Sequence, residues 1–292
     1  MTLYYVTLHF KIYGMFYSNA RVTFTVQLQD AAYHMHNRLK IEQGEIQPPF
    51  TIHPINLNNT MTWTYFYIEM ADKLLGYKNN RKSLIEVIYS LDEKYIDYIK
   101  NKDGGLLSDI DPFTVFGIFN RGIKQDSRFK ICEFFKEKLH IAADVPSDFD
   151  GVPVLNNMMA IFFKRESANN TILPLWDLFE AVISNDRSEI RKTFDMVSKQ
   201  HGIRWNITMG LFWIRPYDYI ALDSTNRSYL PTLGVKVFNE KQIDSEHYLA
   251  LIDDVKRKIN GKSIKESNIP EISHQAWIGG SHNTTSDMSR HY

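Results

Sequence analysis

Thr62-Trp-Thr-Tyr-Phe-Tyr-Ile-Glu-Met-Ala-Asp-Lys-Leu-Leu-Gly-Tyr77 is the stretch of this sequence that decides its fold class. Its large apolar side chains recur at spacings of three and four residues: Trp63, Phe66, Tyr67, Met70, Leu74 and Tyr77. Because an α-helix turns once every 3.6 residues, this spacing gathers them on one side of a helix. We predict an amphipathic helix in which Glu69, Asp72 and Lys73 face water.

Downstream of this stretch, helical periodicity continues over most of the chain. Further helices are predicted over residues 84–91 (or on to 99), 112–119, 126–139, 154–164, 172–184, 187–199 and 244–259. The apolar segment 206–214 fits a helix or a strand, and residues 219–223 suit a short strand. The predicted fold class is therefore mainly α, with a multi-helix domain over about residues 60–260.

Upstream, the pattern changes to short β-branched and aromatic runs. Tyr4-Tyr-Val-Thr-Leu-His-Phe10 and Arg21-Val-Thr-Phe-Thr-Val-Gln27 have this character, and the second alternates strictly. Such runs are typical of strands. Prolines and asparagines then crowd residues 43–60, as in a linker. We predict a small β-rich N-terminal lobe with its linker over residues 1–58, and the helical domain over 59–260.

Composition limits the function classes open to the chain. Its 292 residues are 43% hydrophobic, which is enough to bury a core, and 34 basic residues balance 34 acidic ones. A neutral chain has no overall field for DNA or anionic membranes, so any DNA contact must be local. The single cysteine, Cys132, excludes an internal disulfide and is expected to be a core residue.

The sequence shows neither a signal peptide nor a long apolar stretch. Its N-terminus lacks the basic start and apolar run of a signal peptide. Nowhere does an uninterrupted apolar stretch reach the 18 residues needed to cross a bilayer. We therefore expect a cytoplasmic protein without a membrane partner.

Motifs for nucleotide binding or covalent catalysis are not found. Gly261-Lys-Ser263 resembles the end of a P-loop, but Lys256 stands where the first glycine is required and a helix precedes it. There is no Gly-x-Ser-x-Gly elbow and no His-Glu-x-x-His motif. We therefore assign no catalytic, cofactor-binding or metal-binding residue, and the chain is not expected to be an enzyme.

Two pairs of aspartates could carry metal chemistry. Asp109 and Asp111, and likewise Asp148 and Asp150, are spaced so that converging loops could bring their carboxylates onto a magnesium ion. That arrangement would make the chain a metal-dependent nuclease. Aspartates before apolar helical stretches more often cap helices, and capping is the interpretation that we favour here.

Arginine and asparagine side chains at the ends of apolar stretches are the candidate contacts for DNA or a docking partner. They are Asn120, Arg121, Arg215, Asn226 and Arg227. A guanidinium there can bind a phosphate, or it can pair internally with a carboxylate. The candidate internal partners are Asp148, Asp150 and Asp223.

Between Thr62 and Trp277 the chain carries a series of phrases that occur in the same order in one known family. The phrases are Phe66-Tyr-Ile-Glu-Met-Ala-Asp-Lys-Leu-Leu75, Lys78-Asn-Asn-Arg81, Asp109-Ile-Asp-Pro-Phe-Thr-Val-Phe-Gly-Ile-Phe-Asn-Arg121, Pro146-Ser-Asp-Phe-Asp-Gly-Val-Pro-Val-Leu-Asn-Asn157, Leu175-Trp-Asp-Leu-Phe179, Trp205-Asn-Ile-Thr-Met-Gly-Leu-Phe-Trp-Ile-Arg-Pro216 and Leu222-Asp-Ser-Thr-Asn-Arg227. This stretch resembles the region ahead of the motor in McrB-like restriction proteins, which drive the cleavage of modified DNA.

The resemblance implies a non-catalytic accessory region that couples DNA recognition to an AAA+ NTPase motor. The Walker motifs, the arginine finger and the base-reading pocket of such proteins are not in this sequence, so the implied partners are a motor domain or subunit and DNA. Ala276-Trp-Ile-Gly-Gly280 resembles the first strand of a following module, which makes residues 261–292 a linker and a truncated module. A free-standing protein- or DNA-binding module of a phage-defence locus is the alternative.

Overall fold

The computed structural model describes residues 5–7, 23–25, 61–101, 103–163, 168–200 and 202–288. The chain divides into two compact units, Met1–Asn58 and Asn59–Tyr292. In the first unit, strands β1 (Tyr5–Thr7) and β2 (Thr23–Thr25) pair in antiparallel register. The rest of the predicted β-rich lobe lies outside the described residues.

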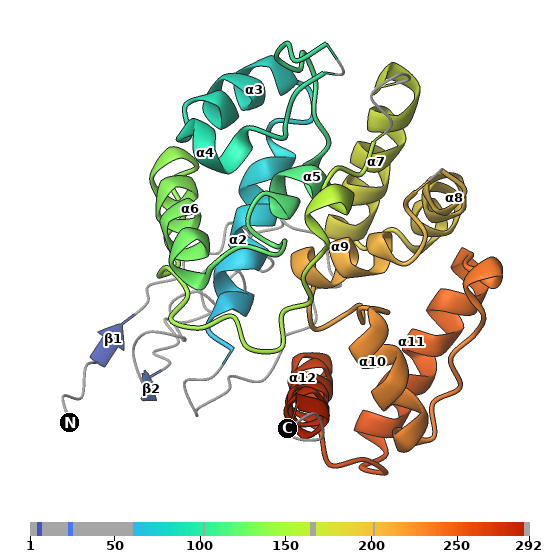
Figure 1. Cartoon of the computed structure of the whole chain (residues 1–292). Coiled ribbons are helices and arrows are strands. Elements are labelled where there is room, and N and C mark those ends of the chain that lie inside the picture. Colours follow the sequence, from blue (N-terminus) through green and yellow to red (C-terminus); the bar gives the residue numbers. More distant parts are fainter. Residues whose placement is uncertain are drawn as a thin grey trace, which may run out of the picture. The chain divides into compact units, whose positions relative to one another are not determined.

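The described part of the second unit is built from helices, most of them joined by short loops, with longer connections before α5 and between α6 and α7 (Figure 1). Its elements are α2 (Trp63–Leu75), α3 (Arg81–Tyr89), α4 (Glu93–Ile96), α5 (Pro112–Gly117), α6 (Gln125–Lys138), η1 (Asn157–Met159), α7 (Ala168–Ile183), α8 (Arg187–Ser198), α9 (Asn206–Ile214), α10 (Ser224–Tyr229), η3 (Leu230–Leu233), η4 (Glu240–Gln242), α11 (Ser245–Asn260) and α12 (Ile269–Met288). The prediction of a mainly α domain is confirmed, and the ambiguous segment 206–214 is helix α9.

Helix α2 forms one centre of the core because its apolar stripe is buried against α7 and α9. Phe66, Met70 and Leu74 are fully buried on this stripe. One expectation for α2 is wrong: Glu69 does not face water but is only 8% exposed. Its carboxylate accepts the backbone N–H groups of Ala142 and Ala143, each at 2.7 Å, so a loop covers it.

Three buried tryptophans fasten loops to the core. The indole N–H groups of Trp63, Trp176 and Trp213 donate to the carbonyls of Asp150, Ile110 and Pro153 at 3.1, 2.9 and 3.0 Å. A buried indole must find an acceptor for its single donor. Each tryptophan therefore fixes one loop carbonyl, and two of the three hold the segment around residues 150–153.

Helix α5 is wholly buried, and it begins as the sequence predicts. Asp111 caps it by accepting the N–H of Thr114 at 2.9 Å, with Pro112 at the first helical position. The neighbouring helix α9 comes very close, because a Cβ on Gly210 would lie 2.6 Å from a ring carbon of Phe113. Only a glycine allows this approach of α5 and α9.

The other helices build outward from this centre. Helices α7 and α8 pack against each other, and α8 in turn packs on α11. There the rings of Phe194 and Tyr248 stack with centroids 5.1 Å apart. Cys132 on α6 is fully buried, which confirms the prediction that it is a core residue.

The predicted helix over residues 154–164 is wrong, since only η1 forms there. Leu155 instead bridges to Arg121, and its N–H donates to the carbonyl of Asn120 at 2.9 Å. The predicted strand over 219–223 is also wrong. The backbone of this segment forms hydrogen bonds with side-chain hydroxyls instead of with another strand: the Thr208 hydroxyl accepts the N–H of Leu222, and the Tyr248 hydroxyl donates to the carbonyl of Ile220.

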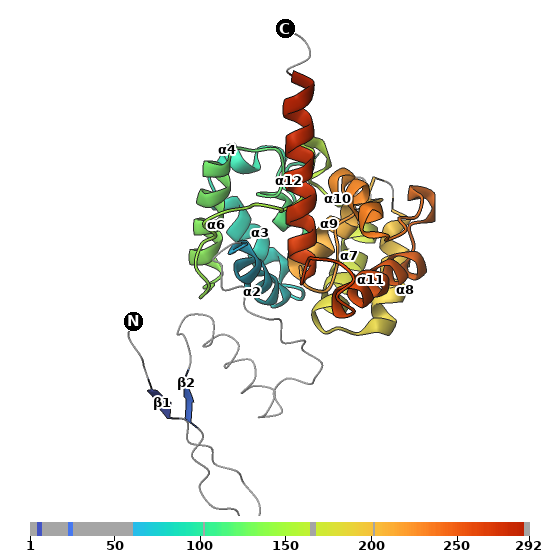
Figure 2. The ribbon, with the colours of Figure 1, turned by 90° about the horizontal axis from the view of Figure 1, so that it is seen from below.

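The predicted strand at residues 276–280 is wrong as well, because this segment lies within the long helix α12. Asn268 and Glu271 cap the start of α12, with the N–H of Glu271 bonded to the Asn268 side chain at 2.9 Å. The first turns of α12 pack on α10. This packing reaches Gly280, where a Cβ would lie 3.0 Å from the Thr225 side chain, while Gly279 faces open space. The far end of the helix leaves the body of the unit (Figure 2).

Candidate functional site

Arg121, the first candidate for a DNA contact, is a buried residue. Its guanidinium donates to the carbonyls of Ile118 and Tyr95 at 3.2 and 3.0 Å, and to the Asn157 side chain at 3.4 Å. The Tyr98 ring covers it, with the centroid 4.3 Å from Cζ. Its acceptors are therefore carbonyl and amide oxygens, and none of the predicted aspartates pairs with it within the described residues.

Asn120 forms a buried polar group with Tyr67 and Arg128, separate from the contacts of Arg121. The Asn120 amide oxygen accepts from the Tyr67 hydroxyl at 2.6 Å and from Arg128 at 2.7 Å. Burial raises the pKa of the Tyr67 hydroxyl well above its usual range. The Arg128 guanidinium also lies over the Phe149 ring, 4.0 Å from its centroid. Asn120 therefore joins α2, the end of α5 and α6.

Arg215 pairs with an aspartate, but not with a predicted one. Its guanidinium donates to the Asp72 carboxylate at 2.6 Å, across the interface between α9 and α2. Asp72 lies one turn after Glu69 on α2, where the sequence predicted only a solvent-facing charge. The Arg215 side chain is 11% exposed, so this pair holds two helices together.

Asn226 and Arg227 are in α10, where Asp223 caps the helix. The Asn226 amide donates to the Asp223 carboxylate at 2.6 Å and to the Ser273 hydroxyl of α12 at 3.1 Å. Ser273 in turn donates to the carbonyl of Gly151 at 2.8 Å. Arg227 lies over the Trp205 ring at 5.0 Å and meets the backbone carbonyl of Asp223, not its carboxylate.

The aspartates of the two acidic pairs serve four separate purposes. Asp111 caps α5, whereas Asp109 pairs with Arg81 at 2.8 Å. Asp148 accepts the Thr62 hydroxyl at 3.1 Å, and Asp150 contributes its backbone carbonyl to Trp63. Among the described residues, no three His, Cys, Asp or Glu side chains gather to hold a metal ion. The magnesium arrangement required for the nuclease is thus not formed by these residues.

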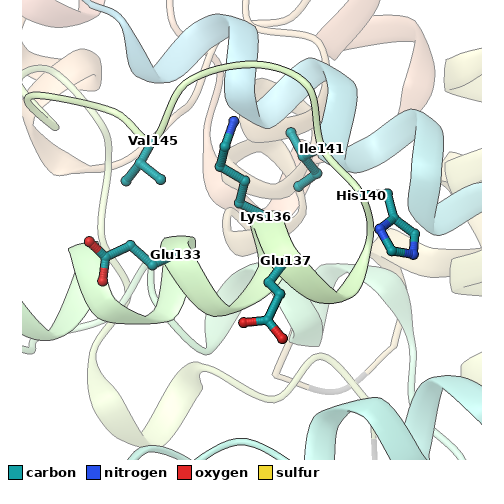
Figure 3. A pocket seen from close by; sticks show the side chains of 6 residues that line it. All are labelled: Glu133, Lys136, Glu137, His140, Ile141 and Val145. Carbon is teal, nitrogen blue, oxygen red and sulfur yellow. The ribbon is translucent and has the colours of Figure 1, made fainter.

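A hollow of about 600 Å³ lies between α6 and the segment that follows it (Figure 3). Lys136 reaches from α6 toward this segment, while Glu137 points away from it. The Lys136 ammonium donates to the carbonyls of Ala142 and Ala143, the residues whose N–H groups bind Glu69. Lys136 and Glu69 therefore hold this loop from two sides. The hollow is open and has charges of both signs. Its lining residues are Glu133, Lys136, Glu137, His140, Ile141 and Val145.

Sequence reasoning missed Arg128 and Ser273, which complete the two polar groups around Asn120 and Asn226. Neither belongs to a motif, so spacing alone offered no signal for them. In contrast, the capping pattern Asn268-Ile-Pro-Glu271 was readable and would have identified α12 as a helix. The described part of the chain contains no helix that is long and apolar enough to span a membrane.

In its described part, this unit is a helical domain with an aromatic core, in which the candidate asparagines and arginines join helices and loops. A family profile described as a domain of unknown function (DUF8425) matches residues 63–279. The chain belongs to this family. No curated protein and no solved structure matches it.

Proposed function

We propose that the chain is a non-catalytic accessory region of a McrB-like, modification-dependent DNA restriction system. In this role it couples DNA recognition to an AAA+ NTPase motor carried by another domain or subunit. The observation that carries the proposal is the ordered series of McrB-like phrases between Thr62 and Trp277. It spans almost the same residues as the family match, 63–279.

The structure adds support because these phrases pack on one another. The first phrase is α2, and the phrase beginning at Trp205 contains α9, which packs on it. The phrase from Asp109 contains α5, which packs on α7 and α9. These phrases therefore contribute to one core.

Helix α12 is the element that we assign to contact with the motor. The far end of this helix leaves the body of the unit (Figure 2). Its Trp277 is 43% exposed and stacks on His274 with ring centroids 5.9 Å apart. Exposed tryptophans are common centres of binding energy in protein interfaces. Trp277 therefore offers the motor an exposed aromatic contact on the part of α12 that is still packed on the unit.

The test is co-elution of the purified chain with the McrB-like AAA+ protein of the same cell, together with NTPase assays. We expect a complex at micromolar concentration and altered nucleotide turnover in the presence of DNA. Trp277→Ala should weaken the complex by about tenfold or more. Met196→Ala, which removes an apolar side chain of similar exposure (51%) from α8, is the matched control.

Two outcomes would count against the proposal. If the chain and the motor elute separately and turnover is unchanged, the chain has no accessory role. Nucleotide hydrolysis by the chain alone, without any motor, would contradict its non-catalytic character. A cytoplasmic location and a β-rich lobe over residues 1–58 complete the proposal, and both can be tested by cell fractionation and circular dichroism of that segment.

A further inference from the structure

Two segments of this neutral chain carry basic residues without acidic ones. Between Lys256 and Lys265 every charged residue is basic. Between residues 224 and 239 the only charged residues are Arg227 and Lys236. The first segment covers the end of α11 and its following loop, and the second covers α10, η3 and the residues after it.

The two segments lie side by side in the fold. The Lys258 ammonium is 3.3 Å from the position that a Cβ on Gly234 would take, so the end of α11 touches the end of η3. The loop after α11 is held at both ends. Ser263 donates to the Lys258 carbonyl at 3.1 Å, and Glu266 accepts the Tyr229 hydroxyl of α10 at 2.5 Å.

Several cations of this surface have their own carboxylates, and others do not. Lys256 pairs with Asp218 at 2.9 Å, and Arg257 pairs with Asp254 at 2.7 Å. Within the described residues, no ion pair involves the four remaining lysines, which we call the lysine surface: Lys236, Lys258, Lys262 and Lys265. The nearest acid in sequence, Glu266, is 7% exposed and bonded to Tyr229.

The surroundings of the lysine surface favour the phosphates of a duplex over other anionic partners. Amphipathic helices on lipid surfaces and proteins that bind single strands use exposed apolar or aromatic side chains as well as charge. The exposed large hydrophobic residues of the described chain all lie outside the two segments. Lysines alone supply point charges, which suit contacts to phosphates without reading base sequence.

From this geometry we infer that the lysine surface binds the phosphate backbone of duplex DNA, independently of sequence and methylation. The choice of DNA among polyanions rests on the proposed function. The surface holds the duplex on the accessory region, while recognition of the modified base is performed elsewhere. The acids nearest to it, Asp218, Asp254 and Glu266, are bonded to Lys256, Arg257 and Tyr229.

The experiment measures binding of the full chain to a fluorescent duplex, methylated and unmethylated, as salt rises from about 50 to about 200 mM. Four phosphate contacts predict a slope of log K against log salt of about −3.6, a loss of roughly a hundredfold over this range. Replacing the four lysines of the surface by glutamine should flatten the slope toward zero. The matched control removes the same charge from exposed positions on α2, α3 and α6 and before α6: K73Q, K82Q, K124Q and K130Q.

The inference is supported if only the lysine-surface variant loses affinity and both duplexes bind alike. It is overturned if wild-type chain shows no salt-sensitive binding, if both quadruple variants behave alike, or if the chain prefers vesicles containing anionic phospholipid. Thermal unfolding of each variant checks that the fold is intact. Failure of the proposed function would instead appear as absence of a complex with the motor, which this binding assay does not measure.

Discussion

Arg121 is a buried cation that pairs with no carboxylate among the residues that the structure describes. Its donors are distributed over the carbonyls of Ile118 and Tyr95 and the Asn157 amide, and the Tyr98 ring covers one face. Carbonyl oxygens are strong acceptors in a low-dielectric interior, so they stabilise the charge together with the ring. The arginine therefore ties α5, α4 and the 155–157 segment together.

Replacing Arg121 by alanine should destabilise the fold and leave DNA affinity of the remaining folded protein unchanged. The buried carbonyls of Ile118 and Tyr95 would lose their donors, and we expect a cost of about 2–4 kcal/mol in the free energy of unfolding. Urea denaturation measures this loss. Lys124→Ala, at an exposed position nearby, should change stability by less than about 0.5 kcal/mol.

Asp111 should make stability depend on pH. Burial raises the pKa of its carboxyl from the usual 3.8 to about 6, so the folded protein holds this proton more tightly than the unfolded chain does. As pH falls from 7 to 5, the folded state is therefore favoured. The free energy of unfolding of the wild type should rise relative to Asp111→Asn, measured by urea denaturation at each pH. A constant difference between them would contradict the raised pKa.

At the scale of elements, the contact of α12 with the 148–153 segment depends on Gly151. Its φ is +75°, and a Cβ would lie 2.7 Å from the Cα of His274. Gly151→Ala should therefore push α12 away, and we expect faster hydrogen exchange and proteolysis within residues 269–278. These readouts follow the detachment of one helix, not global unfolding.

The control for this prediction is Gly202→Ala. Gly202 has a similar positive φ of +87° but no atom within 4 Å of its Cβ position. It should show only the backbone cost of about 1–2 kcal/mol. Equal rates of hydrogen exchange and proteolysis in α12 of both variants would mean that the clash with His274 does not cause the detachment of this helix.

Two helical glycines should respond to alanine in opposite directions. Gly210→Ala places a Cβ 2.6 Å from the Phe113 ring and should lower stability by about 1–3 kcal/mol, since α5 and α9 must separate. Gly279→Ala meets nothing within 4 Å and should stabilise α12 by about 0.5–1 kcal/mol. Thermal melts of both variants test this, and a loss in both would argue against the open space beside Gly279.

The elements that sequence predicted well are those whose own periodicity or caps determine them. Helix α2 follows from its apolar stripe, and α5 from Asp111 and Pro112. The failures at 154–164 and 219–223 have a tertiary cause. Their backbone groups bond to partners such as Asn120 and Thr208, which lie far away in sequence, and periodicity carries no information on such bonds.

At the scale of the whole molecule, the candidate site was predicted in part. The sequence identified Asn120, Arg121 and Asn226 as polar residues at the ends of apolar stretches, and each lies in a buried polar group. Their partners could not be predicted, because Arg128 and Ser273 reach them only through the packing of separate helices. The net charge of the whole chain is zero and so gives no sign of the lysine surface, whose basic residues stand out only in short stretches of sequence.

The second unit should fold without the first. Its described hydrophobic core runs from Met61 to Ala276, inside the unit Asn59–Tyr292. A fragment of residues 59–292 should therefore unfold in one cooperative transition, with a midpoint close to that of the full chain. Circular dichroism in a urea series measures this. A broad, non-cooperative loss of helix would show that residues 1–58 are required.

Cys132 is a natural probe for local opening of the core around α6. It is the only thiol in the sequence, it is fully buried on α6, and burial raises its pKa well above the usual range. A thiol-specific dye reacts with the thiolate, so it can label this side chain only when α6 comes away from the core. The labelling rate in native buffer therefore measures how readily the core opens around Cys132, without denaturant and without an engineered probe.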